Sequence, residues 1–133
     1  MPDIRRVTAA FATAPQLAPA DMTAAAAEGY RLVINNRPDG EAPGQPSSAE
    51  MERAAKAAGM EYLHAPVVGA PTAEQVRQVR GAVEAAAGPV LAFCRSGTRS
   101  IVTWARGEAQ AGVPVDELVA AGRNAGYDLS GAL

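Results

Sequence analysis

The chain has 133 residues, of which 48% are hydrophobic and 20% charged, and these values are typical of one soluble globular domain over residues 1–133. Twelve basic and fourteen acidic residues give a formal net charge of -2. The basic residues are scattered along the chain, so nucleic acid is not an expected partner. A single cysteine, Cys94, and a single histidine, His64, exclude a disulfide framework and a zinc site built from Cys and His ligands. We therefore expect no metal and no cofactor.

The longest stretch without charges is too short and too broken for a membrane helix, which needs about eighteen apolar residues. It covers residues 7–20 and is interrupted by Pro15, Gln16 and Pro19. Two arginines precede it, as in a signal peptide, but Asp3 and the very short apolar core argue against one. We expect a cytoplasmic protein without a membrane partner.

Short β-branched runs alternate with alanine-rich stretches along the chain, which is typical of a parallel sheet covered by helices. Ser47 with Glu50, and Thr72 with Gln75, stand at the spacing of capping boxes that begin helices. The run 90–93 is apolar on both faces, as in a central strand with helices on both sides. The first ten or so residues are expected to add a short β-ribbon. In chain order the other predicted elements are a helix over 19–28, a strand over 31–35, a helix over 47–59, a strand over 61–65, a helix over 72–88, the strand 90–93, a helix that ends near residue 112 and a short helix over 114–124.

The loop over residues 94–100, with the sequence Cys-Arg-Ser-Gly-Thr-Arg-Ser, joins the predicted central strand to the next helix. This place is the carboxyl edge of the sheet, where open α/β proteins bind their ligands. Backbone N–H groups must turn inward in so short a loop, and Gly97 supplies the torsional freedom that such an anion-binding nest needs. The helix N-terminus and two arginines, Arg95 and Arg99, add positive charge. All of these favour the thiolate form of Cys94 and make it the candidate nucleophile.

A lone cysteine at the end of an apolar strand is often only a small buried hydrophobe. A structural cysteine, however, does not need two arginines, a glycine and three hydroxyl residues in the next six positions. The guanidinium of Arg99 can fork onto two oxygens of a bound oxyanion. Ser100 is either a hydroxyl at the helix start or a donor to the sulfur of Cys94. The candidate catalytic residues are thus Cys94, Arg99 and Ser100, and the candidate anion-binding residues are Arg37, Arg95, Ser96, Gly97 and Thr98.

Three other residues have structural interpretations. His64, in the second predicted strand, is expected to be a hydrogen-bonded sheet histidine rather than a base. Trp104 lies three residues after Ile101 and is expected to pack in the core. Tyr127 is expected to dock the last helix onto the rest of the domain.

The loop over residues 94–100, called the active loop from here on, and the sequence around it resemble two known families. Residues 94–100 match the C-R-S-G-x-R-S active loop of rhodaneses, but the D-x-R segment and the glycine-histidine-proline turn usual in rhodaneses are missing. A second resemblance covers nearly the full length of the chain and is carried by residues 33–41, 45–47, 88–92, 94–100, Trp104 and 125–128. By these residues the chain resembles the bacterial β-lactamase hydrolase-like, protein-phosphatase-like domain family. That resemblance implies a fold like the tyrosine and dual-specificity phosphatases, with about four strands in a mainly parallel sheet and helices on both faces.

The resemblance leaves two reactions open, because the family has been described as phosphatase-like and as sulfurtransferase-like. Phosphatases of this fold place five residues between cysteine and arginine, whereas four separate Cys94 from Arg99. Those phosphatases also use an aspartic acid on a mobile loop to protonate the leaving group. The corresponding loop, 66–72, contains no carboxylate. Asp39 or Glu41 is the candidate substitute acid, and surface turn chemistry is the competing interpretation of both.

Sulfur transfer needs no such acid, and we rank it first. In this hypothesis Cys94 takes sulfane sulfur from thiosulfate or a persulfide such as glutathione persulfide, and passes it to a thiol acceptor such as glutathione. The alternative is a protein-tyrosine-phosphatase-like phosphatase with a phosphocysteine on Cys94. A third hypothesis is a non-catalytic anion-binding module, although a pure binder could use serine in place of cysteine.

Overall fold

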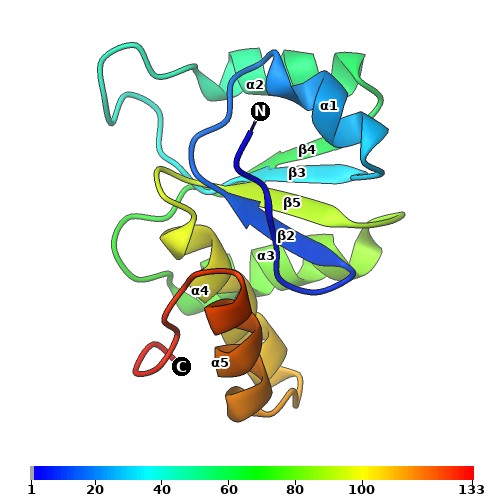
Figure 1. Cartoon of the computed structure of the whole chain (residues 1–133). Helices are drawn as coiled ribbons and strands as arrows, with labels where there is room; N and C mark the ends of the chain where they lie inside the picture. The colour runs from blue at the N-terminus through cyan, green and yellow to red at the C-terminus, as the bar shows by residue number, and fades with distance from the viewer. Residues whose placement is uncertain (1) are drawn as a thin grey trace.

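The computed structural model describes residues 2–133, which form a five-stranded sheet with helices on both faces (Figure 1). Four strands are parallel to one another and the first is antiparallel to its neighbour. The predicted α/β fold, with about four strands in a mainly parallel sheet, is therefore confirmed. In spatial order the strands are β1 (Arg5–Arg6), β2 (Phe11–Ala14), β5 (Val90–Phe93), β3 (Leu32–Asn35) and β4 (Glu61–His64).

Five helices cover the sheet in this part of the chain. Figure 1 shows α1 and α2 on one face, α3 and α4 on the other, and α5 outside α4. Both predicted capping boxes are formed, by Ser47 with Glu50 at the start of α2 and by Thr72 with Gln75 at the start of α3. The bounds are α1 (Asp21–Ala27), α2 (Ser48–Ala57), α3 (Ala73–Ala85), α4 (Thr98–Gln110) and α5 (Val115–Asn124).

The N-terminal region differs most from the sequence prediction. Beyond a short ribbon it contributes β2, a fully buried strand that lies beside β5 with Phe11 opposite Val90. The helix predicted over 19–28 begins only at Asp21, whose carboxylate accepts a hydrogen bond of 2.7 Å from the backbone N–H of Ala18. The sheet therefore has a strand on each side of β5, and the active loop leaves from its interior.

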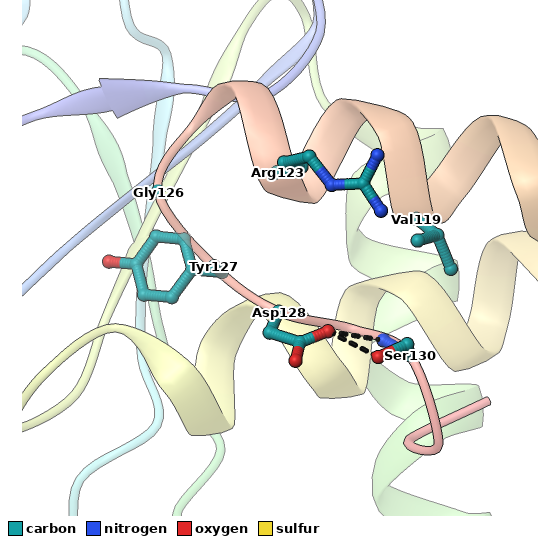
Figure 2. Close-up of a pocket in the computed structure, with 6 residues that line it drawn as sticks. All are labelled: Val119, Arg123, Gly126, Tyr127, Asp128 and Ser130. Carbon is teal, nitrogen blue, oxygen red and sulfur yellow. Dashed lines mark hydrogen bonds between the residues drawn. The ribbon is translucent and has the colours of Figure 1, made fainter.

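After α5 the chain reverses at Gly126 and runs back along the helix (Figure 2). Tyr127 and Leu129 from this returning segment are buried against the domain. The burial of Tyr127 agrees with the expectation that it docks the last helix onto the rest of the domain. No helix within residues 2–133 has the length and apolar character needed to cross a membrane.

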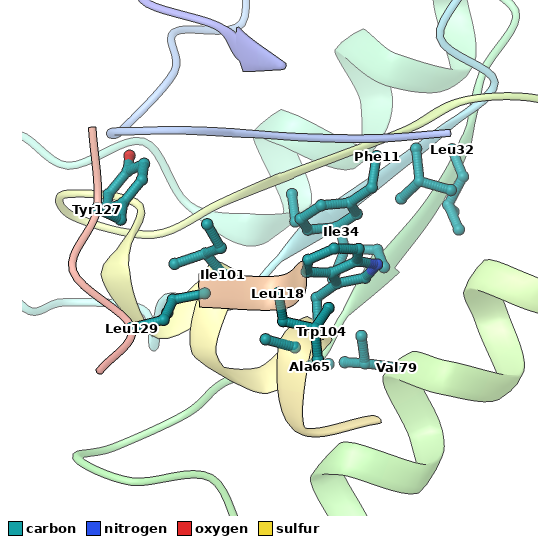
Figure 3. Packing of buried hydrophobic residues seen from close by; sticks show 13 residues of the cluster. Phe11, Leu32, Ile34, Ala65, Val79, Ile101, Trp104, Leu118, Tyr127 and Leu129 are labelled. Carbon is teal, nitrogen blue, oxygen red and sulfur yellow. The ribbon is translucent and has the colours of Figure 1, made fainter. Parts of the chain in front are cut away.

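The core lies in two layers, one on each face of the sheet, and β5 contributes to both. Val90 and Ala92 pack in the layer beneath α3, α4 and α5, whereas Leu91 and Phe93 pack beneath α1 and α2. In the first layer the rings of Phe11 and Trp104 are stacked with their centroids 4.6 Å apart (Figure 3). Burial on both faces holds β5 firmly and so fixes the position of the residue that follows it, Cys94.

Candidate active site

Cys94 lies between the end of β5 and the start of α4, at the carboxyl edge of the parallel strands. Its side chain is completely buried, and the backbone N–H of Gly97 donates a hydrogen bond of 3.1 Å to its Sγ. An N–H directed at sulfur stabilises negative charge there, as does the N-terminus of the helix that begins at Thr98. The loop therefore has the arrangement that an anionic nucleophile requires.

Gly97 gives the loop its shape. Its φ is +94°, in the left-handed region that residues with a Cβ rarely adopt. A Cβ at this position would also collide with the hydroxyl oxygen of Tyr127. On the exposed side of the loop, Ser96 Oγ donates to Thr98 Oγ1 at 3.1 Å. The loop thus has a buried side that faces the sulfur and an exposed side that carries hydroxyl groups.

Arg99 makes the forked contact that the sequence predicts, but with a carboxylate of the protein. Its Nη1 and Nη2 donate to the two carboxylate oxygens of Glu41, each at 2.8 Å, and Nη1 also donates to the carbonyl oxygen of Val67 at 2.8 Å. The hydrogen bonds with Glu41 raise the pKa of Arg99, and the charge of a Cys94 thiolate raises it as well. The guanidinium is therefore held in a fixed place and is shaped to hold two oxygens.

Glu41 is shared between two arginines. Arg37 is buried, and its Nε donates to Glu41 Oε1 at 2.8 Å while its Nη1 donates to Gln16 Oε1 at 3.0 Å. Hydrogen bonds from Arg99 and Arg37 lower the pKa of Glu41 to about 2. This carboxylate is ionised at neutral pH and holds no proton for a leaving group.

Asp39, the other candidate acid, is bound at the start of a helix. Its Oδ1 accepts a hydrogen bond of 2.7 Å from the backbone N–H of Ser48, in the first turn of α2. A carboxylate at this position stabilises the helix N-terminus. Of the two candidate acids, Glu41 therefore contacts the guanidinium of Arg99, and Asp39 Oδ1 contacts the start of α2.

Two predicted site residues have no contact that assigns a role to them. Ser100 Oγ is buried and has no hydrogen-bond partner within residues 2–133, so the bond to the sulfur of Cys94, one of the two interpretations of this residue, is not formed. The side chain of Arg95 is exposed. His64 has the expected structural contact, 2.8 Å from its Nε2 to the carbonyl oxygen of Arg37.

The sequence interpretation missed three contributions to the site. The sequence offers Glu41 as an acid or as a residue of a surface turn, and not as the partner of Arg99. Thr13 donates a hydrogen bond of 3.1 Å to the carbonyl oxygen of Gly97, and Tyr127 donates one of 3.0 Å to that of Ser96. The only available signal for Thr13 was a hydroxyl in an apolar run, and nothing near Tyr127 in the sequence points to the loop.

The ionised Glu41 should make the protein sensitive to acid. Its folded-state pKa of about 2 is below the ordinary 4.5, so its stabilising effect is present above about pH 4.5 and is lost as the pH falls toward 2. We expect Glu41→Gln to be less stable than the wild type at pH 7 and to lose this part of the acid dependence. Urea unfolding of both proteins at several pH values between 7 and 2 measures the effect.

The matched control for this prediction is Glu61→Gln, at an exposed position of β4. It should leave the acid dependence of unfolding as in the wild type. Equal pH dependence of Glu41→Gln and the wild type would show that the two arginines do not hold the Glu41 carboxylate in solution.

No group of three or more His, Cys, Asp or Glu side chains suited to a metal ion is found in the described part of the chain. The sheet with helices on both faces, and the strand-loop-helix unit that joins a buried cysteine to a forked arginine, define the tyrosine-phosphatase class of folds. A sequence model of the phosphatase-like domain of beta-lactamase hydrolase-like proteins matches residues 3–111. The chain belongs to this family.

Relatives and solved structures agree with this assignment. A beta-lactamase hydrolase-like protein of Agrobacterium fabrum is 39% identical over 115 residues, which are 85% of this chain and 27% of that protein. This chain therefore spans about a quarter of the length of the curated relatives that it matches. A Neisseria meningitidis protein described as a candidate phosphatase has a solved structure with 34% identity and a TM-score of 0.86, over 97% of this chain and 92% of that one. Tk-PTP in its active form, at 22% identity, has a TM-score of 0.72 over 94% of this chain and 85% of that one, and shares the fold.

Proposed function

We propose that the chain is a cysteine-dependent phosphatase that forms a phosphocysteine on Cys94. The observation that carries this proposal is the buried Cys94 Sγ with the Gly97 N–H directed at it, in one strand-loop-helix unit with the forked guanidinium of Arg99. The Neisseria relative, described as a candidate phosphatase, supports it. Sulfur transfer, which the sequence ranks first, has no support from the comparisons and becomes the second candidate.

The proposed reaction has two displacements at phosphorus. The thiolate of Cys94 attacks the phosphorus of a monoester, the ester P–O bond breaks as the S–P bond forms, and the ester oxygen leaves as an anion that takes a proton from water. Water then attacks the phosphocysteine, the S–P bond breaks, and inorganic phosphate and the thiolate are released. The loop N–H groups and the fork of Arg99 stabilise the equatorial oxygens, provided that Arg99 exchanges Glu41 for the substrate.

The state of the carboxylates limits the substrates. Arg37 and Arg99 keep Glu41 ionised before substrate binds, and Arg37 still binds it when Arg99 turns to the substrate. Asp39 Oδ1 is bound to the helix N-terminus. Without a general acid, which contributes about 10²- to 10⁴-fold, the leaving oxygen must depart with its negative charge. Aryl phosphates have stable leaving groups and are therefore the proposed substrate class.

One observation favours the second candidate, a sulfurtransferase: Glu41, the carboxylate bound to Arg99, is ionised and has no proton to donate. The thiolate of Cys94 would attack the outer sulfur of thiosulfate, the S–S bond would break, and sulfite would leave without a proton. A thiol acceptor such as glutathione would then collect the sulfur from the Cys94 persulfide. In both candidates the partners are small anions or thiols. The proposed location is the reducing cytoplasm, where a single thiol stays reduced.

Two measurements on the purified protein distinguish the candidates. We expect hydrolysis of an aryl phosphate such as p-nitrophenyl phosphate, and a phosphorylated Cys94 in intact-mass spectra of acid-quenched reactions. A persulfide appears instead as the mass of one added sulfur after incubation with thiosulfate, removable by dithiothreitol. A stable persulfide without any phosphate release would replace our proposal with the second candidate.

Asp39→Asn tests the absence of a general acid. Asparagine keeps an oxygen that accepts from the N–H of Ser48 but holds no acidic proton. We therefore expect unchanged hydrolysis of aryl phosphates. A loss of about 10²-fold, confined to alkyl phosphates with poor leaving groups, would identify Asp39 as the acid.

A further inference from the structure

The segment after α5 contacts the active loop from outside the residues that the family model matches, which end at 111. Tyr127 reaches across 31 positions of sequence, and its hydroxyl donates to the carbonyl oxygen of Ser96 at 3.0 Å. Figure 2 shows this hydroxyl pointing away from Arg123, Asp128 and Ser130, with which Tyr127 lines a pocket. The hydroxyl thus serves the active loop rather than that pocket.

The bonded carbonyl belongs to the same peptide group as the N–H that contacts the nucleophile. The carbonyl of Ser96 and the N–H of Gly97 share one planar unit and point in opposite directions. Tyr127 holds the oxygen end of this unit, and the N–H end donates to Cys94 Sγ at 3.1 Å. The hydroxyl, the peptide and the sulfur form a chain of hydrogen bonds in which each bond polarises the next.

The next peptide of the loop is held in a similar way. Thr13 lies on β2 and is completely buried, and its hydroxyl donates a hydrogen bond of 3.1 Å to the carbonyl oxygen of Gly97. Two consecutive carbonyls of the loop, those of Ser96 and Gly97, therefore each accept a hydrogen bond from a hydroxyl group. The N–H of the first of these peptides, that of Gly97, is directed inward at Cys94 Sγ, whereas the N–H of the second, that of Thr98, faces Ser96 Oγ at 3.5 Å.

Tyr127 is itself well fixed. It is 9% exposed, and the guanidinium of Arg5 lies over its ring, 5.2 Å from the centroid. Burial raises the pKa of Tyr127, so its hydroxyl remains a donor at neutral pH. The absence of a side chain at Gly97 leaves the space in which this hydroxyl lies.

We propose that Tyr127 is a positioning residue of the active loop, whose hydroxyl orients and polarises the peptide that stabilises the Cys94 thiolate, with Thr13 supporting the next peptide. This inference deepens the proposed function, since it rests on Cys94 being the nucleophile. It does not depend on which substrate the nucleophile attacks.

The test is Tyr127→Phe, which removes one oxygen and keeps the ring. Thiolate formation is followed by ultraviolet absorbance against pH, with the same protein carrying Cys94→Ser as the background. Loss of one hydrogen bond, with its net effect of about 1 kcal/mol, should move the midpoint upward by about 0.5 to 1 pH unit and lower kcat on an aryl phosphate about five-fold. The KM should stay nearly constant, because Tyr127 does not touch the substrate.

Tyr30→Phe is the matched control, because Tyr30 is also buried and has Arg6 over its ring at 5.9 Å. It should titrate and turn over like the wild type. Thr13→Val should change both measurements in the same direction as Tyr127→Phe. If Tyr127→Phe does not fold, the Thr13→Val variant tests the proposal in its place.

A wild-type titration midpoint and kcat in Tyr127→Phe would overturn the proposal. So would a loss of thermal stability alone, which would leave Tyr127 as a docking residue. If Tyr127→Phe does not fold, a wild-type titration in Thr13→Val overturns it too. If the midpoint moves but the wild type hydrolyses no phosphate ester, the proposed function fails and the positioning role stands.

Discussion

Replacing Cys94 with serine is expected to abolish turnover while the protein remains folded. A serine hydroxyl is neutral at pH 7 and a much weaker nucleophile, so we expect a loss of kcat on the order of 10⁴-fold or more. The smaller oxygen still accepts from the N–H of Gly97 in the same buried place. The free energy of unfolding should therefore change by about 1 kcal/mol or less. Aryl phosphate hydrolysis and urea unfolding measure the two effects.

The result also tests the hypothesis of a non-catalytic anion-binding module. Such a module would bind phosphate equally well with serine at position 94, and the wild type would turn over no substrate. Residual hydrolysis by Cys94→Ser near the wild-type rate would show that Cys94 is not the nucleophile, and would restore its interpretation as a small buried hydrophobe.

Arg99→Lys should cause the second large loss, although it keeps a positive charge. Lysine cannot reproduce the planar fork that here holds both oxygens of Glu41. Removal of one oxyanion donor typically costs about 10²- to 10³-fold in kcat, and we expect a loss in this range. Steady-state kinetics on an aryl phosphate, with circular dichroism to verify folding, make the measurement.

The control for this prediction is Arg95→Lys, in the same loop but with an exposed side chain. Its effect should be much smaller, because no fork is lost there. Equal activity of Arg99→Lys and the wild type would mean that Arg99 supplies only its charge. A larger loss in Arg95→Lys would reverse the roles of the two arginines.

Much of the fold could be predicted because its signals are local. The capping boxes at Ser47 and Thr72 and the two-sided apolar run of β5 each lie within a few residues. The strand β2 could not be predicted in this way. Its sequence, Phe-Ala-Thr-Ala, has two alanines of low strand propensity and stands directly before Pro15. Its strand conformation comes from pairing with β5, a long-range contact without a local pattern.

The candidate site also has a local part that the sequence predicts and a long-range part that it does not. The loop from Cys94 to Ser100 could be identified because all its unusual residues are contiguous. The contact of Arg99 with Glu41 spans 58 positions, and that of Tyr127 with Ser96 spans 31. Side chains brought together by the folded sheet leave no spacing that a single sequence reveals. The sequence therefore presents Glu41 as an acid or a turn residue, whereas the folded chain makes it the partner of two arginines.

The place of β5 in the sheet has a consequence for how the protein folds. This strand pairs on one side with β2 and on the other with β3, so Val90 lies opposite both Phe11 and Leu32. The hydrogen bond from Thr13 to Gly97 likewise joins residues that are 84 positions apart in the sequence. Pairings between strands so distant in sequence form slowly compared with local helices such as α2 and α3. We therefore expect the hydrogen bonds that surround Cys94 to form late in folding, after β2, β3 and the segment after α5 have joined the domain.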